Sequence, residues 1–246
     1  VTKNSTLAHI GVIPHAVGYN DAVILDHQVH WSVQSASYNL KLRGIPIHMI
    51  RHNNMEQLEE MLNKFKSRYH KVWYMADGIY SMYGDCAPVE RLKELMDKYK
   101  VLNLYFDDVH GMSWTGVNGT GFIRSHWQFI PERMILVSTL SKSFGASGAF
   151  VLSGNKGLIE KIKNFGGPLT FSAQLEPSAV AAAIESAKIH LSPEISDMQN
   201  LLQLKIKAFH RALLASNIPL MSEGTTPVFY IPVGIPETAY TLTRRL

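Results

Sequence analysis

The sequence contains a single cysteine, Cys86, among 246 residues. One cysteine cannot form an internal disulfide, so the chain is not a disulfide-stabilised scaffold, and we expect a reducing compartment, the cytoplasm. No apolar run approaches the roughly 20 residues that a membrane-spanning helix requires, so we expect no transmembrane segment.

Charge is also sparse, since only 18% of the residues are charged and the net charge is +4. The lysines and arginines are scattered along the chain and form no basic stripe, so we expect no nucleic-acid partner. The hydrophobic content of 46% is ordinary for a globular protein with a substantial core.

Short apolar runs alternate with segments of helical periodicity. This alternation is typical of an α/β fold with a mostly parallel sheet. Proline or asparagine stands at the start of several of the helical segments, where these residues favour helix initiation. The expected strands are Ala22–Asp26, Ile45–Ile50, Lys71–Ala76, Leu102–Phe106, Met134–Ser138 and Ala149–Ser153, and the expected helices are Met55–Phe65, Pro88–Tyr99, Ser178–Ile189 and Glu194–Ala215.

The long amphipathic segment Glu194–Ala215 is expected to leave the sheet and to begin a second region. We therefore expect a large domain over residues 1–193, incomplete at its N-terminal side. Residues 194–246 are expected to form a linking helix and the start of a smaller α+β domain, beginning with the run Thr226–Pro232.

Polar residues follow four of the expected strands, at the edge where open α/β sheets bind ligands. His30 lies after the first strand, Asp77 and Ser81 after the third, and Asp107 and His110 after the fourth. Each group alone is more often a capping or structural feature. Asp107, Asp108 and His110 could also bind a metal ion, but that alternative leaves the next segment unexplained.

That segment is Ser138-Thr139-Leu140-Ser141-Lys142, which follows the fifth strand. Pyridoxal 5'-phosphate (PLP) requires a lysine amine, a carboxylate opposite its pyridine nitrogen, and donors for its phosphate. Lys142 precedes a run of small residues that would let a bulky cofactor approach the backbone. The four strand ends together therefore favour a PLP site.

The run STLSKSFGASGAF around Lys142 resembles the PLP-lysine motif of the α-oxoamine synthases. The segment from Asp77 to Gly111, DGIYSMYGDCAPVERLKELMDKYKVLNLYFDDVHG, resembles the same family in order and spacing, as does FSAQLEP at Phe171–Pro177. The family consists of fold-type I PLP enzymes, which join an amino acid to an acyl-CoA with loss of carbon dioxide. The resemblance implies a mostly parallel sheet of the seven-stranded type.

The resemblance also implies the roles of the residues nearest the ring. Lys142 would form the Schiff base, and Asp107 would pair with the pyridine nitrogen. His110 and Ser81 would lie near the phenolic oxygen, and His30 would stack on the ring face. Asp77 would be a further acidic residue near the ring.

For the phosphate, the resemblance implies Thr139 together with Ser5 and Thr6 at the start of the first helix, where a helix N-terminus favours an anion. Ser172 would reach the phosphate of a partner subunit, so a homodimer with a shared site is implied. The arginine that holds the substrate carboxylate in this family would lie beyond Leu246.

The implied reaction is an acyl-CoA:amino acid C-acyltransfer, and a PLP-dependent aminotransferase is the alternative. A non-catalytic, lysine-less subunit is disfavoured because Lys142 is present. Ser81 and Thr139 could instead be turn or strand-end caps, and His30 a core histidine, as we expect of His9, His15, His27 and His48. Asp108 is expected to be a surface or capping residue. His9 differs from the family pattern, because the family usually has asparagine at this position.

Overall fold

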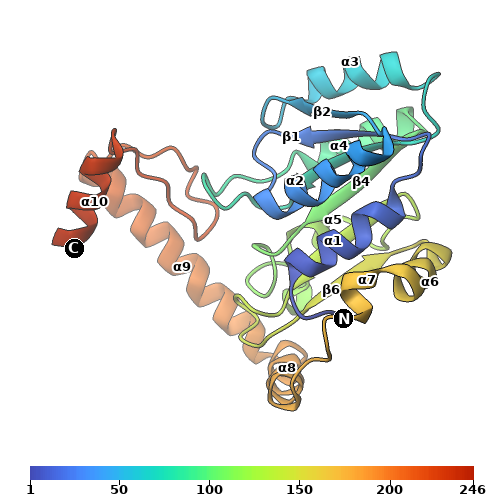
Figure 1. Ribbon diagram of the computed structural model, residues 1–246. Coiled ribbons are helices and arrows are strands. Elements are labelled where there is room, and N and C mark those ends of the chain that lie inside the picture. Colours follow the sequence, from blue (N-terminus) through green and yellow to red (C-terminus); the bar gives the residue numbers. More distant parts are fainter.

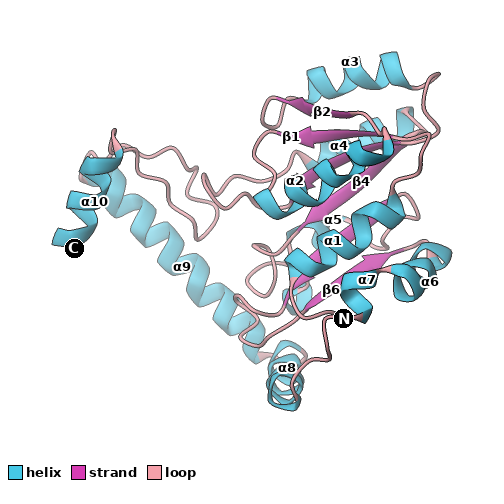
Figure 2. Ribbon diagram, in the orientation of Figure 1, coloured by secondary structure: helices cyan, strands magenta, loops and turns pink.

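A six-stranded sheet forms the centre of the computed structural model, which describes residues 1–246 (Figures 1 and 2). Its order is β2-β1-β3-β4-β5-β6, and every neighbouring pair is parallel except β5 with β6. The α/β class and the mostly parallel sheet are therefore confirmed. The strands are β1 (Ala22–Asp26), β2 (Ile47–Ile50), β3 (Val72–Asp77), β4 (Leu102–Asp107), β5 (Met134–Thr139) and β6 (Ala149–Ser153).

The sheet has six strands where a seven-stranded type was expected. Thr2 forms a single antiparallel bridge with Ala149 of β6, so it occupies the position that a seventh strand would take. One bridge does not make a strand, because a strand needs several consecutive pairings. The first residues of the chain nevertheless lie against the edge of the sheet (Figure 1).

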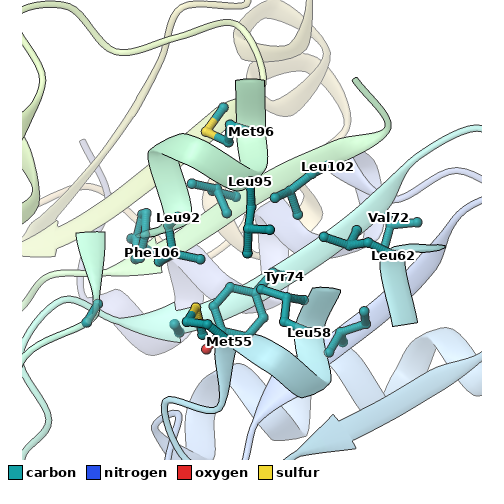
Figure 3. Close-up of a cluster of buried hydrophobic side chains, with 14 of the residues drawn as sticks. Met55, Leu58, Leu62, Val72, Tyr74, Leu92, Leu95, Met96, Leu102 and Phe106 are labelled. Atoms are coloured by element: carbon teal, nitrogen blue, oxygen red, sulfur yellow. The ribbon is translucent and has the colours of Figure 1, made fainter. Parts of the chain in front are cut away.

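Helices cover both faces of the sheet because consecutive strand residues point to opposite sides. The helices α3 (Met55–Phe65) and α4 (Val89–Lys98) pack on Tyr74 and Phe106, as Figure 3 shows. On the other face, α1 (Ser5–Ala16), α2 (Trp31–Tyr38) and α6 (Lys156–Phe165) pack on strand residues such as Trp73. Each face thus has its own apolar core.

The remaining helices are shorter or lie toward the C-terminus. They are the 3-10 helices η1 (Asn39–Arg43) and η2 (Val117–Gly119), and the α-helices α5 (Phe122–His126), α7 (Gly167–Thr170), α8 (Pro177–His190), α9 (Glu194–Ala215) and α10 (Pro236–Arg245). Helix α9 extends away from the sheet, as Figure 1 shows. None of the helices combines the length and the apolar content that spanning a bilayer requires.

The run Thr226–Pro232, expected to begin a smaller α+β domain, forms no strand. Its backbone finds no partner strand, although Tyr230 O accepts a hydrogen bond from Met221 N at 3.0 Å. Thr226 instead donates its hydroxyl to Gly84 O at 2.7 Å. This segment therefore returns to the turn after β3. The division into two domains stays a prediction.

Candidate active site

The expected site residues gather at the carboxyl ends of β1, β3, β4 and β5. Lys142 lies in the turn that joins β5 to the antiparallel β6. Leu140 N donates to Gly148 O at 2.8 Å, and Ala146 N donates to Leu140 O at 2.8 Å, which closes the turn. Gly145 has a φ of 77°, a left-handed conformation that glycine adopts without strain. The turn therefore presents Lys142 at the edge of the sheet.

The Lys142 amine lies 2.8 Å from Nε2 of His110. Burial, followed by the positive charge of Lys142, lowers the pKa of His110 to about 4, so the ring is neutral at pH 7 and its Nε2 accepts this hydrogen bond. Burial likewise lowers the pKa of Lys142, although the carboxylates of Asp107 and Asp77 oppose this. The Lys142 amine therefore interacts with three of the expected residues, namely His110, Asp107 and Asp77.

Asp107 ends β4 and is almost completely buried. Its Oδ1 accepts a hydrogen bond from Val109 N at 3.2 Å, and its Oδ2 lies 2.9 Å from Nε2 of His9. Burial alone would raise the pKa of Asp107, but His9, which lies within hydrogen-bond distance, and the Val109 N–H lower it below its usual value. The carboxyl group is therefore held in its charged form.

Asp77 lies directly beside Asp107, since the two residues are paired in the register of β3 and β4. Its Oδ1 accepts a hydrogen bond from His30 N at 3.0 Å, so it fixes the backbone of His30 at the start of α2. The Nδ1 atom of His30 accepts from Ser32 N at 3.3 Å, which makes His30 the N-cap of that helix. His30 is exposed, which contradicts the alternative of a core histidine.

The first turn of α1 and the end of β5 meet at the expected phosphate-binding position. Thr139 pairs with Ala149, and Ala149 bridges Thr2, three residues before Ser5. Asn4 caps α1 through Leu7 N at 2.9 Å, while the N–H groups of Ser5 and Thr6 have no partner in the structure. Free N–H groups at a helix start favour an anion.

Thr139 itself is buried, and its hydroxyl donates to Gly148 O at 3.0 Å. Its oxygen accepts from Ser141 N at 3.2 Å and lies 2.7 Å from Ser141 Oγ. The hydroxyl proton of Thr139 is thus already donated to a carbonyl oxygen within the turn. The side chain of Ser141, by contrast, is exposed and accessible to a ligand. The structure adds Ser141 as a phosphate-binding candidate, and the role of Thr139 stays a prediction.

Two expected residues make no hydrogen bond to this cluster. Ser81, in the turn after β3, and Ser172, between α7 and α8, are half-buried, and neither side chain makes a hydrogen bond within the chain. Their predicted roles near the phenolic oxygen and at a partner's phosphate remain predictions.

Asp108 lies inside the molecule, which corrects the expectation that it is a surface residue. Its Oδ2 accepts from Ile123 N at 2.8 Å at the start of α5, so the capping alternative holds, and its Oδ1 has no partner. Burial raises the pKa of Asp108. Of the four histidines expected in the core, His9 is fully buried, His15 and His48 are partly buried, and His27 is exposed.

No group of histidine, cysteine, aspartate and glutamate side chains in the structure has an arrangement that could hold a metal ion. An apolar groove of about 650 Å³ lies between α8, α9 and the turn that follows Lys142. Phe144, Ile189 and Leu202 line it, but Lys142, Asp107 and His110 do not. The groove is therefore separate from the polar cluster.

The contacts of His9 with Tyr105 and Asp107 were not predicted from the sequence. His9 Nδ1 lies 2.8 Å from the hydroxyl of Tyr105, which is two residues before Asp107 on the same face of β4. The strand periodicity that puts Tyr105 and Asp107 on one face was a usable signal. The departure from asparagine at His9 was a second one.

Comparison with known proteins decides the family. The profile named aminotransferase class I and II matches residues 3–246. The chain belongs to the aminotransferase class I and II family. This membership agrees with the sheet and with the position of Lys142.

Curated relatives of this family member are 8-amino-7-oxononanoate synthases, which are α-oxoamine synthases, so the resemblance inferred from the sequence is confirmed. The protein from Coprothermobacter proteolyticus is 35% identical over 182 residues, covering 74% of this chain and 45% of the relative. The protein from Thermoanaerobacter pseudethanolicus is 30% identical over 239 residues, which cover 97% of this chain and 58% of the relative. The chain thus spans about half the length of these relatives.

Among solved structures, the serine palmitoyltransferase from S. paucimobilis with a bound PLP–myriocin aldimine superposes with a TM-score of 0.84 at 27% identity. The superposition covers 96% of this chain and 59% of the serine palmitoyltransferase chain. The Sphingomonas wittichii serine palmitoyltransferase gives 0.80 at 28% identity, covering 92% and 55%.

Proposed function

We propose that this chain is part of a PLP-dependent acyl-CoA:amino acid C-acyltransferase, which joins the two substrates with loss of carbon dioxide and gives an α-amino ketone. The observation that carries the proposal is the Lys142 amine, held 2.8 Å from a neutral His110 beside the strand-end carboxyl groups of Asp77 and Asp107. The names of the relatives and of the solved neighbours support the reaction class.

The residues present fit PLP. Lys142 would hold the cofactor's aldehyde carbon, and Asp107, kept charged, would hold a proton on the pyridine nitrogen. The free N–H groups of Ser5 and Thr6 would bind the phosphate, together with Ser141. His30, exposed at the start of α2, would cover one face of the ring. When bound, PLP supplies an electron-withdrawing ring that stabilises negative charge at the substrate Cα.

The chain's own acid–base chemistry centres on Lys142. Only a neutral amine can remove a proton, and burial lowers the pKa of Lys142 toward that form. His110 accepts a hydrogen bond from the amine and so directs its lone pair. We infer that Lys142, once released by the incoming amino acid, removes the Cα proton and later returns a proton to the product.

The test uses the full chain with PLP, an amino acid (glycine, serine or alanine) and an acyl-CoA. We expect a visible absorbance band with PLP, borohydride fixation of the cofactor to the protein, and release of free CoA thiol. Lys142→Ala should abolish both the fixation and the thiol release, while Lys163→Ala, at an exposed lysine of α6, should retain them. Fixation of PLP to the Lys142→Ala protein would refute the assignment.

A PLP-dependent aminotransferase is the second candidate, because the family profile that matches includes this class. It would use the same lysine and aspartate but transfer an amino group. Conversion of bound pyridoxamine phosphate by a keto acid, without any acyl-CoA, would identify it.

We also infer that the working enzyme is a homodimer in which Ser172 reaches the partner's site. Exposed apolar side chains occur near Ser172 along the chain, including Phe171, which is 87% exposed, and Ile184 on α8, which is 52% exposed. A cytoplasmic location stays a prediction.

A further inference from the structure

Two buried carboxyl groups lie side by side at the end of the sheet. Asp77 and Asp107 are paired residues of neighbouring parallel strands, so their side chains point to the same face. Each is only 2% exposed. Two adjacent negative charges repel strongly in a buried environment, so the pair is most stable with a single charge.

The two carboxyl groups receive unequal numbers of hydrogen-bond donors. Asp77 accepts one hydrogen bond, from His30 N at 3.0 Å. Asp107 accepts from Val109 N at 3.2 Å and also faces Nε2 of His9 at 2.9 Å. Because a carboxylate gains more from hydrogen bonds than a neutral carboxyl group does, the extra donor favours charge on Asp107.

The direction of the His9 hydrogen bond follows from its second neighbour. The Tyr105 hydroxyl lies 2.8 Å from Nδ1 of His9 and has no other acceptor in the structure. If this hydroxyl donates to Nδ1, the ring carries its proton on Nε2 and donates it to Asp107. The Tyr105 hydroxyl and both ring nitrogens of His9 then each have a hydrogen-bond partner inside the protein.

We propose that His9 is a positioning residue that keeps the single negative charge of the Asp77–Asp107 pair on Asp107. The proposal rests on the proposed function, since Asp107 is the residue that would face the pyridine nitrogen. His9 therefore acts through Asp107 and need not touch the cofactor. Asp77, left neutral, would still accept the hydrogen bond that fixes His30.

The charged groups around the pair agree with this assignment. Burial and the neighbouring charge of Asp107 raise the pKa of Asp77, with Asp26 adding to the rise and Lys142 opposing it. The pKa of Asp107 is lowered despite its burial, through His9, the Val109 N–H and His30.

The test compares PLP affinity, measured by absorbance titration, among matched variants of the full chain. His9→Ala should weaken PLP binding roughly ten- to hundred-fold, because it removes a hydrogen bond to a charged group. His9→Gln, which retains an amide donor, should bind within a few-fold of wild type. His15→Ala, at the other end of α1, is the control for loss of a histidine from that helix.

A double variant separates charge placement from simple loss of packing. Asp77→Asn removes the competing carboxyl group but keeps an oxygen that accepts from His30 N. It should therefore restore most of the PLP affinity in the His9→Ala background. If His9→Ala binds PLP like wild type, or if Asp77→Asn does not restore binding, the proposal is wrong.

A measurement on the cofactor-free protein completes the test. At neutral pH, Asp77→Asn should remove a protonated-carboxyl infrared band, and should remove less of it in the His9→Ala background. An equal loss in both backgrounds would contradict the proposal. A wild-type protein that binds no PLP would instead refute the proposed function, so the two failures are distinguishable.

Discussion

At the scale of single residues, the buried polar atoms of the interior depend on very few hydrogen-bond partners. Nδ1 of His9 has one partner, the Tyr105 hydroxyl, and His9 is completely buried. A buried polar atom that loses its only partner costs about 1–3 kcal/mol. The stability of this part of the core therefore depends on one phenolic hydroxyl.

We predict that Tyr105→Phe lowers the free energy of unfolding by about 1–3 kcal/mol, because it leaves Nδ1 buried without a donor. Urea denaturation of the cofactor-free chain measures this. Tyr19→Phe is the control, because that side chain is 73% exposed and its hydroxyl makes no hydrogen bond within the chain. Equal stability of Tyr105→Phe and wild type would show that the hydroxyl is not needed by His9.

At the scale of elements, one histidine joins three loops of the site edge. His52 follows β2, and its Nδ1 lies 2.8 Å from Asp26 at the end of β1. Its Nε2 lies 2.6 Å from Asp85, in the turn that carries Ser81. Because carboxylates only accept hydrogen bonds, both ring nitrogens must carry protons, and the ring is an imidazolium.

The surroundings of His52 contain other titratable groups. Tyr80 packs edge-on against the ring at 4.4 Å, and Tyr74 donates its hydroxyl to Asp26 at 3.1 Å. Burial would lower the pKa of His52, but the hydrogen bonds and charges of Asp26 and Asp85 raise it to about 9. This cation therefore ties the loop that leads to His30 to the turn of Ser81.

We predict that the stabilisation from His52 is complete below pH 6.5 and is lost as the pH rises to about 9. The pKa is higher in the folded state than in the unfolded state, so deprotonation weakens the fold. The loss should be roughly 1–2 kcal/mol, below the full linkage value, because the ring is partly exposed.

Urea denaturation between pH 6 and pH 9.5 tests this. His52→Gln should be less stable than wild type at pH 6, with a difference that shrinks toward pH 9.5. His70→Gln, at an exposed histidine, should follow the wild-type curve. A pH-independent difference for His52→Gln would mean that the ring is not charged in the fold.

The strands were the elements that the sequence predicted best. Each expected strand overlaps an observed one with ends within two residues, because buried parallel strands are continuous apolar runs. Helix α2 was missed, since its sequence WSVQSASY mixes serine with apolar residues and its start depends on the His30 cap. The hydrogen bond of Thr226 to Gly84 was not predicted, because it joins segments that lie far apart in the sequence.

For the site, as for the fold, the sequence predicted local features and not long-range contacts. Strand ends and turns are local, so Lys142, Asp107 and His110 could be grouped from the sequence. The contact of His9 with Asp107 spans 98 residues along the chain and depends on how α1 lies across the sheet. No local pattern specifies that contact.

At the scale of the whole molecule, the exposed apolar surface is unevenly distributed. Much of it lies between residues 165 and 214, on the segment before α8 and on α8 and α9, which extend from the sheet (Figure 1). Exposed apolar side chains concentrated in one part of the chain point to an interaction site. The exposed side chains are Phe165, Phe171, Val180, Ile184, Ile189, Leu191, Met198, Leu201, Leu204, Phe209 and Leu214.

We predict that the chain forms a dimer through the α8 part of this surface, next to Ser172. Light scattering on a size-exclusion column should give twice the chain mass of 27.6 kDa. The double variant Val180→Glu with Ile184→Glu places two charges one helical turn apart on α8, where desolvating them in an interface is costly, so it should shift the protein to monomer.

Leu42→Glu is the matched control, because Leu42 is 90% exposed but lies in η1, outside the α8 surface. It should remain dimeric. Because a shared site would need Ser172 of the partner subunit at the phosphate, the monomeric double variant should also bind PLP more weakly, although its own Lys142 and Asp107 are unchanged. A monomeric variant with unchanged PLP affinity would show that each chain completes its own site.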